Sequence, residues 1–254
     1  MLKQLLFGFL YVLVVAGCQQ SVDTSGGQEN PPAPGFDLTH SDPAAVELAD
    51  SVMAAMGGRE NWDKTRFISW NFFGRRNLVW DKHTGNVRIE SLSDSTIYLV
   101  NINNLEGRVQ VRGQELTAPD SLQKMLAKGK SIWINDSYWL VMPFKLKDTG
   151  VTLKYLGEDT TLTGTKANVV EVTFQDVGDT PQNKYRVYVD LKDNLVKQWA
   201  YYKDASQDSA SGVWPWDNYK RYGDILLSAN RSDERGPRDV RVDSKLPKET
   251  FIEF

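Results

Sequence analysis

From residue 66 onward, the chain is a succession of short segments rich in aromatic and β-branched residues, with turn residues between them. The first segments are "RFISWNFFG", "NLVWDKHTGNVRIESL", "STIYLVNIN" and "GRVQVRGQEL". Later ones are "VTLKYLGE", "NVVEVTFQ", "NKYRVYVD", "NLVKQWAYY", "NYKRYGDILLSANRS", "RDVRVDS" and "TFIEF". Strands joined by short loops pair antiparallel, whereas parallel strands need long crossovers. The sequence therefore predicts a meandering antiparallel sheet of about ten or eleven strands rather than βαβ units.

Two segments have a helical pattern instead. The stretch "SDPAAVELADSVMAAMGG" places Val46, Ala49, Met53 and Met56 on one apolar stripe, and a glycine pair ends it. Residues 119–147, "PDSLQKMLAKGKSIWINDSYWLVMPFKLK", begin like a helix and then become strongly apolar and aromatic. That much apolar surface is too large for an exposed loop. We expect residues 119–147 to cover one face of the sheet, so that the fold class is mainly β with α.

The only cysteine, Cys18, follows a short apolar run that begins after one positive charge, in "MLKQLLFGFLYVLVVAGCQQ". The run is too short to span a bilayer, which takes about 20 apolar residues. Its pattern is typical of a secretory signal peptide, here residues 1–17. The sequence Val-Ala-Gly-Cys resembles the lipobox of bacterial lipoproteins, which implies that the Cys18 thiol carries diacylglycerol. The alternative is an ordinary signal peptide in which the cysteine stands by chance.

Residues 18–35, "CQQSVDTSGGQENPPAPG", are polar and contain glycine and proline. Such a segment lacks the apolar surface to fold, so we expect a flexible tether before a single domain at residues 36–254. The formal net charge is −3, with basic and acidic residues interspersed. This balance argues against nucleic acid as a partner.

Residues that carry catalysis are scarce. His40 and His83 lack the spacing of a zinc site, and no phosphate-binding, dinucleotide-binding or nucleophile motif occurs. We therefore expect no enzyme activity, no metal and no cofactor. Paired carboxylates among aromatic residues leave glycoside hydrolysis as an alternative, and the acids concerned are Asp94, Glu106, Asp136 and Asp217.

The chain has eight tryptophans, most of them in the strand and cover region. Tryptophan suits a core, a sugar platform or a lipid pocket equally well. The stretch "GVWPWDNYKRYGD" is the best candidate for an exposed platform, formed by Trp214, Trp216 and Tyr219. It is equally compatible with an edge strand packed against the cover. A glycan-binding surface lipoprotein is thus the alternative function.

The order of a leading helix, a long antiparallel meander and a helical-aromatic insertion resembles the LolA/LolB lipoprotein-carrier fold. Two stretches carry this resemblance to outer-membrane-lipoprotein-sorting homologues: "MGGRENWDKTRFISWNFFGRRNLVWDKHTGNVRIE" and "WINDSYWLVMPFKLKDTGVTLKYLGE". The resemblance implies a curved sheet that forms an incomplete barrel closed by a helical lid. It also implies a hollow that binds a lipid or the acyl chains of a lipoprotein.

Side-chain alternation indicates which residues would line such a hollow, because alternate residues of a strand share a face. The sheet would supply Ile68, Trp70, Phe72 and Trp80, and the cover would supply Leu122, Met125, Trp133, Trp139 and Met142. Each buried acyl CH₂ contributes about 0.8 kcal/mol, so a dry cavity needs no catalytic group to bind a tail. The alternative is that these residues fill the core completely.

Together these observations predict a monomeric lipoprotein held on a membrane by its own lipid, with an acyl chain as its partner. Gln19, after the anchor cysteine, differs from the Asp that retains many Gram-negative lipoproteins in the inner membrane. We therefore expect an outer-membrane location that faces the periplasm. Outer-membrane lipoprotein sorting is the process that the resemblance implies.

Overall fold

A computed structural model of the chain describes residues 30–232 and 235–254. Cys18 and residues 1–17 lie outside this part, so their predicted roles stay predictions. No helix among the described residues combines the length and the apolar character needed to cross a membrane. The helical elements of the described chain are α1 (Pro43–Ala55), α2 (Arg59–Lys64), α3 (Pro119–Val141), η1 (Met142–Lys145) and η2 (Lys248–Phe251).

The larger of the sheets in the described residues has seven antiparallel strands in the order β14-β1-β2-β3-β4-β5-β6. The chain meanders from β1 to β6, and the last strand returns to pair with the first. The strands are β1 (Phe67–Phe72), β2 (Arg76–Asp81), β3 (Asn86–Ser91), β4 (Thr96–Asn101), β5 (Gly107–Val111), β6 (Gln114–Glu115) and β14 (Pro237–Asp243).

The second sheet has five antiparallel strands in the order β11-β10-β9-β8-β7, and β12 and β13 form a separate hairpin. The sheet contains β7 (Val151–Thr160), β8 (Lys166–Phe174), β9 (Lys184–Asp190), β10 (Val196–Tyr202) and β11 (Gly212–Pro215). The hairpin consists of β12 (Asp217–Tyr222) and β13 (Ile225–Asn230).

This architecture confirms a mainly β fold with α-helices, antiparallel strands and no closed barrel. The described residues form fourteen strands rather than ten or eleven, because two predicted segments are hairpins and β11 is a further short strand. The final segment, predicted as a strand, contains η2 instead. The meander is also split, since α3 separates β6 from β7 and strand pairing does not resume across it.

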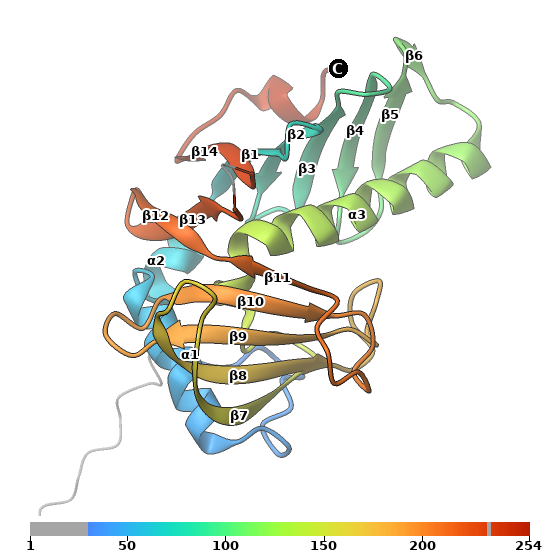
Figure 1. Cartoon of the computed structure of the whole chain (residues 1–254). Helices are drawn as coiled ribbons and strands as arrows, with labels where there is room; N and C mark the ends of the chain where they lie inside the picture. Colours follow the sequence, from blue (N-terminus) through green and yellow to red (C-terminus); the bar gives the residue numbers. More distant parts are fainter. Residues whose placement is uncertain (1–29, 233–234) are drawn as a thin grey trace, which may run out of the picture.

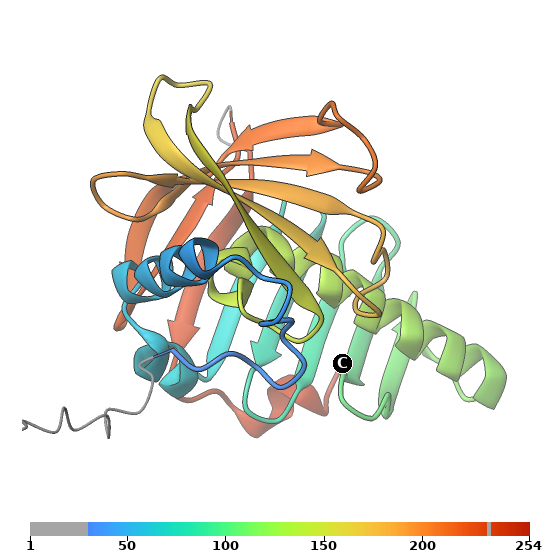
Figure 2. The same cartoon turned by 90° about the horizontal axis from the view of Figure 1, so that it is seen from below.

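Helix α3 lies across the inner face of the seven-stranded sheet, and the five-stranded sheet packs near its C-terminal end (Figures 1 and 2). Its N-terminal half reaches beyond the five-stranded sheet in both views. One apolar cluster spans both sheets and the helices. Helix α1 has Pro43 in its first turn, which agrees with the predicted leading helix. It ends before Gly57, where a Cβ would lie 2.3 Å from the carbonyl oxygen of Asp224.

The described part of the predicted tether, residues 30–35, is bound to the folded chain. Lys147 Nζ donates to the Asn30 carbonyl oxygen at 2.6 Å and to Asp50 Oδ1 at 2.6 Å. The main-chain N–H groups of Ala33 and Gly150 donate to the carbonyls of Lys147 and Gly35 respectively. Residues 30–35 are thus part of the folded chain, which differs from the domain start predicted at Phe36.

Candidate functional site

The residues predicted to line a hollow all belong to, or pack against, the apolar cluster that spans both sheets and the helices. Strand β1 turns Ile68, Trp70 and Phe72 toward it, and the antiparallel register places Trp80 of β2 opposite Ile68. These four side chains are buried, as is Met142 of η1. The alternation of the two strands therefore predicted the inner face correctly, while ligand binding by these residues stays a prediction.

On α3, the predicted residues Leu122, Met125, Trp133 and Trp139 are half-buried and packed against the cluster. Leu122 and Met125 lie in the half of the helix that the five-stranded sheet does not cover (Figure 1). Close to them, Leu126 is buried, and an ideal Cβ on Gly129 would lie 3.1 Å from Tyr98 Cδ1. This half of α3 is thus tightly seated on one sheet and half-exposed along an apolar edge.

Aromatic rings fill the space under the middle of α3. The Trp133 ring meets the Trp80 ring edge-on, with a centroid separation of 5.1 Å. Trp80 in turn meets Trp62 at 6.4 Å, and Trp62 stacks on Phe144 of η1 at 4.2 Å. Such contacts contribute about 0.5–1.5 kcal/mol each beyond their buried area.

A second aromatic group joins the C-terminal end of α3 to the five-stranded sheet. Trp139 lies 4.7 Å from Trp199, 5.1 Å from Trp214 and 5.3 Å from Phe73 between ring centroids. Tyr185 stacks on Trp199 at 4.9 Å. Trp139 therefore contacts β10, β11 and the β1–β2 turn at once, and it fixes this end of the helix.

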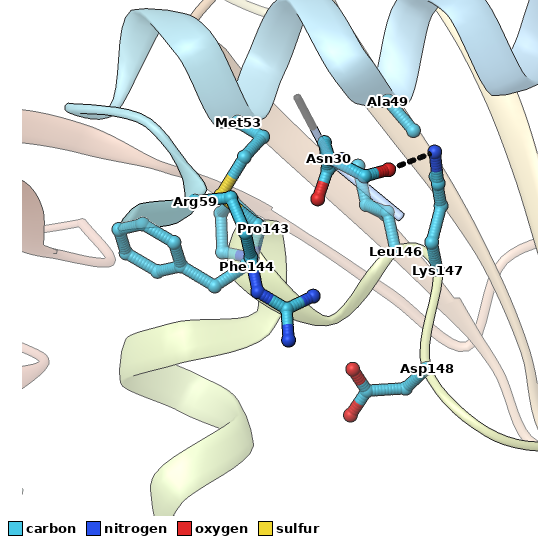
Figure 3. A pocket seen from close by; sticks show the side chains of 9 residues that line it. All are labelled: Asn30, Ala49, Met53, Arg59, Pro143, Phe144, Leu146, Lys147 and Asp148. Atoms are coloured by element: carbon cyan, nitrogen blue, oxygen red, sulfur yellow. Dashed lines mark hydrogen bonds between the residues drawn. The ribbon is translucent and has the colours of Figure 1, made fainter. Parts of the chain in front are cut away.

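Two hollows among the described residues can be compared with the predicted one. A hollow of about 10 Å³ is lined by residues near Asn30, Arg59 and Lys147 (Figure 3). An open depression of about 400 Å³ lies beside Gly35 and Gln175. Neither of these two lies between α3 and the seven-stranded sheet, where the predicted residues pack in or against the apolar cluster.

Buried indole groups are a notable polar feature of this interface. The Nε1 atoms of Trp70, Trp80 and Trp133 are buried and have no hydrogen-bond partner among the described residues. The same holds for Trp199 and Trp216 in the second aromatic group. Each unsatisfied donor costs about 1–3 kcal/mol. These donors therefore oppose the closed packing that surrounds them.

One ion pair ties α3 to the sheet from inside. Arg76 Nε and Nη2 of β2 donate to Asp136 Oδ2 and Oδ1 of α3 at 2.7 and 2.8 Å. The Asp136 side chain is fully buried, whereas that of Arg76 is 22% exposed. Burial raises the pKa of the Asp136 carboxyl above its usual value, although the hydrogen bonds from Arg76 and Asn135 lower it. The desolvation of this carboxylate is thus only partly offset.

A buried arginine packs against the second aromatic group. The Arg231 guanidinium lies over the Trp216 ring, 3.4 Å from its centroid, and donates from Nη2 to the Trp139 carbonyl oxygen at 2.5 Å. It also donates to Ser228 Oγ at 2.9 Å. Burial lowers the pKa of Arg231 to about 9. Arg231 therefore connects β13 to α3 and to the β11–β12 junction.

The exposed aromatic platform proposed for a glycan is not present. Trp216 is completely buried, Trp214 packs on Trp139, and the Tyr219 hydroxyl donates to the Val196 carbonyl oxygen at 2.9 Å. Burial raises the pKa of Tyr219 well above its usual value. The other interpretation of this stretch is correct, since β11 is an edge strand whose Trp214 contacts the cover helix.

The acidic residues considered for hydrolysis have separate environments. Asp136 pairs with Arg76 inside the core, Asp94 accepts the Thr96 N–H in the β3–β4 turn, and Glu106 accepts from Asn104 in the β4–β5 turn. Asp217 is exposed at the start of β12. Within residues 30–232 and 235–254, no three His, Cys, Asp or Glu side chains gather as a metal site would require.

Both histidines lie on the surface. His40 is 74% exposed and contacts Asp37, and His83 bonds the Asp63 carbonyl oxygen at 2.9 Å. Sequence reasoning did not identify the residues that contact α3 from distant parts of the chain, namely Arg76, Arg231 and Trp199. For Arg76 a signal existed, because Asp136 lies one turn after Trp133 on the apolar side of the helix and needed a buried cation.

Comparisons with solved structures give likenesses of fold at low identity. A DUF1329 family protein from Desulfovibrio piger matches with a TM-score of 0.44 and 14% identity, over 84% of this chain and 98% of that one. A putative outer membrane lipoprotein-sorting protein domain from Vibrio parahaemolyticus matches with a TM-score of 0.38 and 12% identity, over 82% and 96%. A LolA superfamily protein from Nitrosomonas europaea matches with a TM-score of 0.33 and 10% identity, over 82% and 96%. No protein-family model and no curated protein matches this chain.

Proposed function

We propose that this protein is a membrane-anchored lipoprotein that binds a lipid, or the acyl chain of another lipoprotein, between α3 and the seven-stranded sheet. The observation that carries the proposal is the half-exposed apolar edge of α3 at Leu122 and Met125, which lies directly over the apolar inner face of the sheet. A binding role in place of catalysis is part of this proposal.

The N-terminal half of α3 is the part that would move. It packs on one sheet only, whereas the C-terminal half is fixed by the Arg76–Asp136 pair and by Trp139. Lifting the free half exchanges apolar protein contacts for apolar ligand contacts. Because each buried CH₂ contributes about 0.8 kcal/mol, a chain of about ten methylenes supplies roughly 8 kcal/mol toward this exchange.

The membrane anchor in this proposal is a diacylglyceryl group on Cys18. Residues 19–29 connect Cys18 to the bound chain at Asn30, and a fully extended connection of this length reaches about 40 Å. A monomer tethered to the periplasmic side of the outer membrane would thus keep its acyl site within reach of the bilayer. Lipoprotein sorting is the process that such a site would serve.

A disulfide across the moving interface tests the proposal. An ideal Cβ on Gly129 lies 3.3 Å from Val100 Cγ1, so cysteines at both positions are within reach of one another. We would introduce Gly129→Cys and Val100→Cys in a chain that carries Cys18→Ser. The reduced protein should bind a fluorescent long-chain acyl probe, and the oxidised protein should not. Equal binding by both forms would exclude a site that opens by lifting α3. The Cys18→Ser chain, treated with the same oxidant, is the control.

A pair of charge substitutions tests whether the acyl chain enters at the N-terminal half of α3. Leu122→Asp should weaken acyl binding at least tenfold, because a carboxylate at the apolar edge opposes burial of a hydrocarbon tail. Gln123→Asp adds the same charge one residue away, at an exposed position, and should leave binding unchanged. Equal losses in the two variants would indicate an effect of charge alone.

A further inference from the structure

The buried indole N–H groups bear on the chemical class of the proposed ligand. Trp70 and Trp80 lie on the same face of adjacent strands, where the register pairs Trp80 with Ile68 and Trp70 with Leu78. Both rings are more than nine-tenths buried. Trp133 of α3 meets Trp80 at a ring separation of 5.1 Å. We call Trp70, Trp80 and Trp133 the indole group.

An interface that held only hydrocarbon would not need these donors. Phenylalanine supplies a comparable flat apolar surface without an N–H, and it occurs in the same layer as Phe72 and Phe144. The indole group instead places three donors in the apolar layer, and none has an acceptor among the described residues. Buried donors in native proteins are normally satisfied, so an acceptor that enters with a ligand would complete the interface.

We propose that the ligand carries a carbonyl oxygen within this layer, that of an acyl ester or an acyl amide, and that the indole group donates to it. The inference rests on the acyl-binding function proposed above and defines its ligand class. Hydrocarbon chains, and alkyl ethers that lack the carbonyl, would fill the space but leave the donors unsatisfied. The site would therefore distinguish acylated molecules from other molecules with long chains.

The location of the indole group is consistent with this assignment. Trp133 is one helical turn before Asp136, whose pairing with Arg76 fixes the middle of α3 to β2. Leu122 and Met125 lie two to three turns earlier, toward the free end of the helix. A tail that enters along the free half would thus meet the donors where the helix becomes fixed.

The test compares an ester lipid with an ether lipid that differs from it only in the carbonyl, and it adds an acyl amide. With the full chain carrying Cys18→Ser, we would measure competition against a fluorescent acyl probe by dipalmitoyl phosphatidylglycerol, by its dihexadecyl ether analogue and by an N-palmitoyl amide. We expect the ester to compete about fivefold better than the ether, which corresponds to one net hydrogen bond. Preference for the amide over the ester would identify N-acyl groups as the source, and the reverse would identify O-acyl groups.

Phenylalanine variants assign the donors. Trp80→Phe and Trp133→Phe should each bring the ester-to-ether ratio toward one, whereas Trp62→Phe should keep it, because Trp62 contacts Trp80 but is outside the indole group. The ratio is internal to each variant, so a general loss of stability does not imitate the effect. In ¹⁵N–¹H spectra, the ester and not the ether should shift the indole signals of Trp80 and Trp133 downfield.

The outcomes separate the two proposals. Equal binding of ester and ether by the native sequence would overturn the carbonyl assignment and leave the acyl-binding function in place. An ester preference that survives in both phenylalanine variants would also overturn it. Binding of neither lipid would overturn the proposed function and this inference with it.

Discussion

Arg76 on β2 and Asp136 on α3 form a bidentate ion pair, and the Asp136 side chain has no contact with solvent. Removal of one partner from a buried pair leaves an uncompensated charge, while replacement of both by apolar residues is often tolerated. Arg76→Met should therefore lower the free energy of unfolding by about 3 kcal/mol, and Arg76→Met with Asp136→Leu should recover most of that loss.

Urea unfolding of both single variants and the double variant gives the interaction free energy directly. The exposed pair Arg108–Glu115, with side chains 46% and 40% exposed, is the matched control. Its interaction free energy should be below about 1 kcal/mol. An additive result at Arg76 and Asp136 would mean that the pair does not hold α3 to the sheet.

The same carboxyl predicts a pH dependence of stability. Because burial raises its pKa, folded Asp136 keeps its proton to a higher pH than the unfolded chain does. Its contribution to stability is present below the unfolded pKa of about 3.9 and is lost as the pH rises through the folded pKa. The stability of the native sequence relative to Asp136→Asn should thus decrease as the pH rises from about 3.9 through the raised pKa of folded Asp136. A relative increase over this range would show that attraction to Arg76 outweighs desolvation.

Gly129 is a position of close approach between α3 and the sheet. A Cβ there would lie 3.1 Å from Tyr98 Cδ1, so a larger side chain must push the helix away. Gly129→Leu should lower the free energy of unfolding by about 2 kcal/mol through overpacking. Ala127→Leu on the exposed side of the same helix should change it by less than about 0.5 kcal/mol. Thermal unfolding of both variants measures the difference, and equal values would contradict the close seating of this half of α3.

Lys147 holds residues 30–35 to the folded chain. Its Nζ donates to Asn30 and Asp50, so Lys147→Met should release residues 30–35 while the sheets remain folded. Loss of a charge-assisted bond of about 1.5–3 kcal/mol should increase the exchange of the Ala33 amide about tenfold or more. Lys145→Met, whose ion pair with Asp148 is half-exposed, should leave that amide protected. Protection that persists without Lys147 would show that main-chain bonds alone hold this segment.

Local pattern predicted the inner face of the sheet, because alternation in β1 is a property of neighbouring residues. It did not predict why Phe67, on the opposite face, is also buried. The Phe251 ring stacks on Phe67 with a centroid separation of 6.2 Å, and Arg88 and Arg108 donate to carbonyls of the C-terminal segment. These contacts join residues more than 140 positions apart, and periodicity carries no signal of them.

Local pattern indicated which side chains face the apolar cluster, and it did not indicate how they pack there. Alternation and the apolar cover segment predicted that Trp80 and Trp133 face one another, whereas Trp139 packs on the five-stranded sheet. Whether such rings enclose a hollow depends on side-chain volumes and on the approach of α3 at Gly129, which only the assembled structure defines. For the same reason the sequence did not predict the five-stranded sheet as a separate partner of α3. Trp199 and Tyr185 belong to strands that follow α3 in the chain, and their contacts with α3 exist only in the folded structure.

Trp216 distinguishes a structural role from a sugar platform. Its ring is fully buried, with Trp199 at 5.4 Å on one side and the Arg231 guanidinium at 3.4 Å from its centroid. Trp216→Ala should therefore lower the free energy of unfolding by about 3–5 kcal/mol, whereas an exposed platform residue would cost less than about 0.5 kcal/mol. Trp214→Ala, at the half-buried edge strand, should give an intermediate loss. Chemical denaturation ranks the three proteins, and a Trp216→Ala protein as stable as the native sequence would contradict a structural role for this ring.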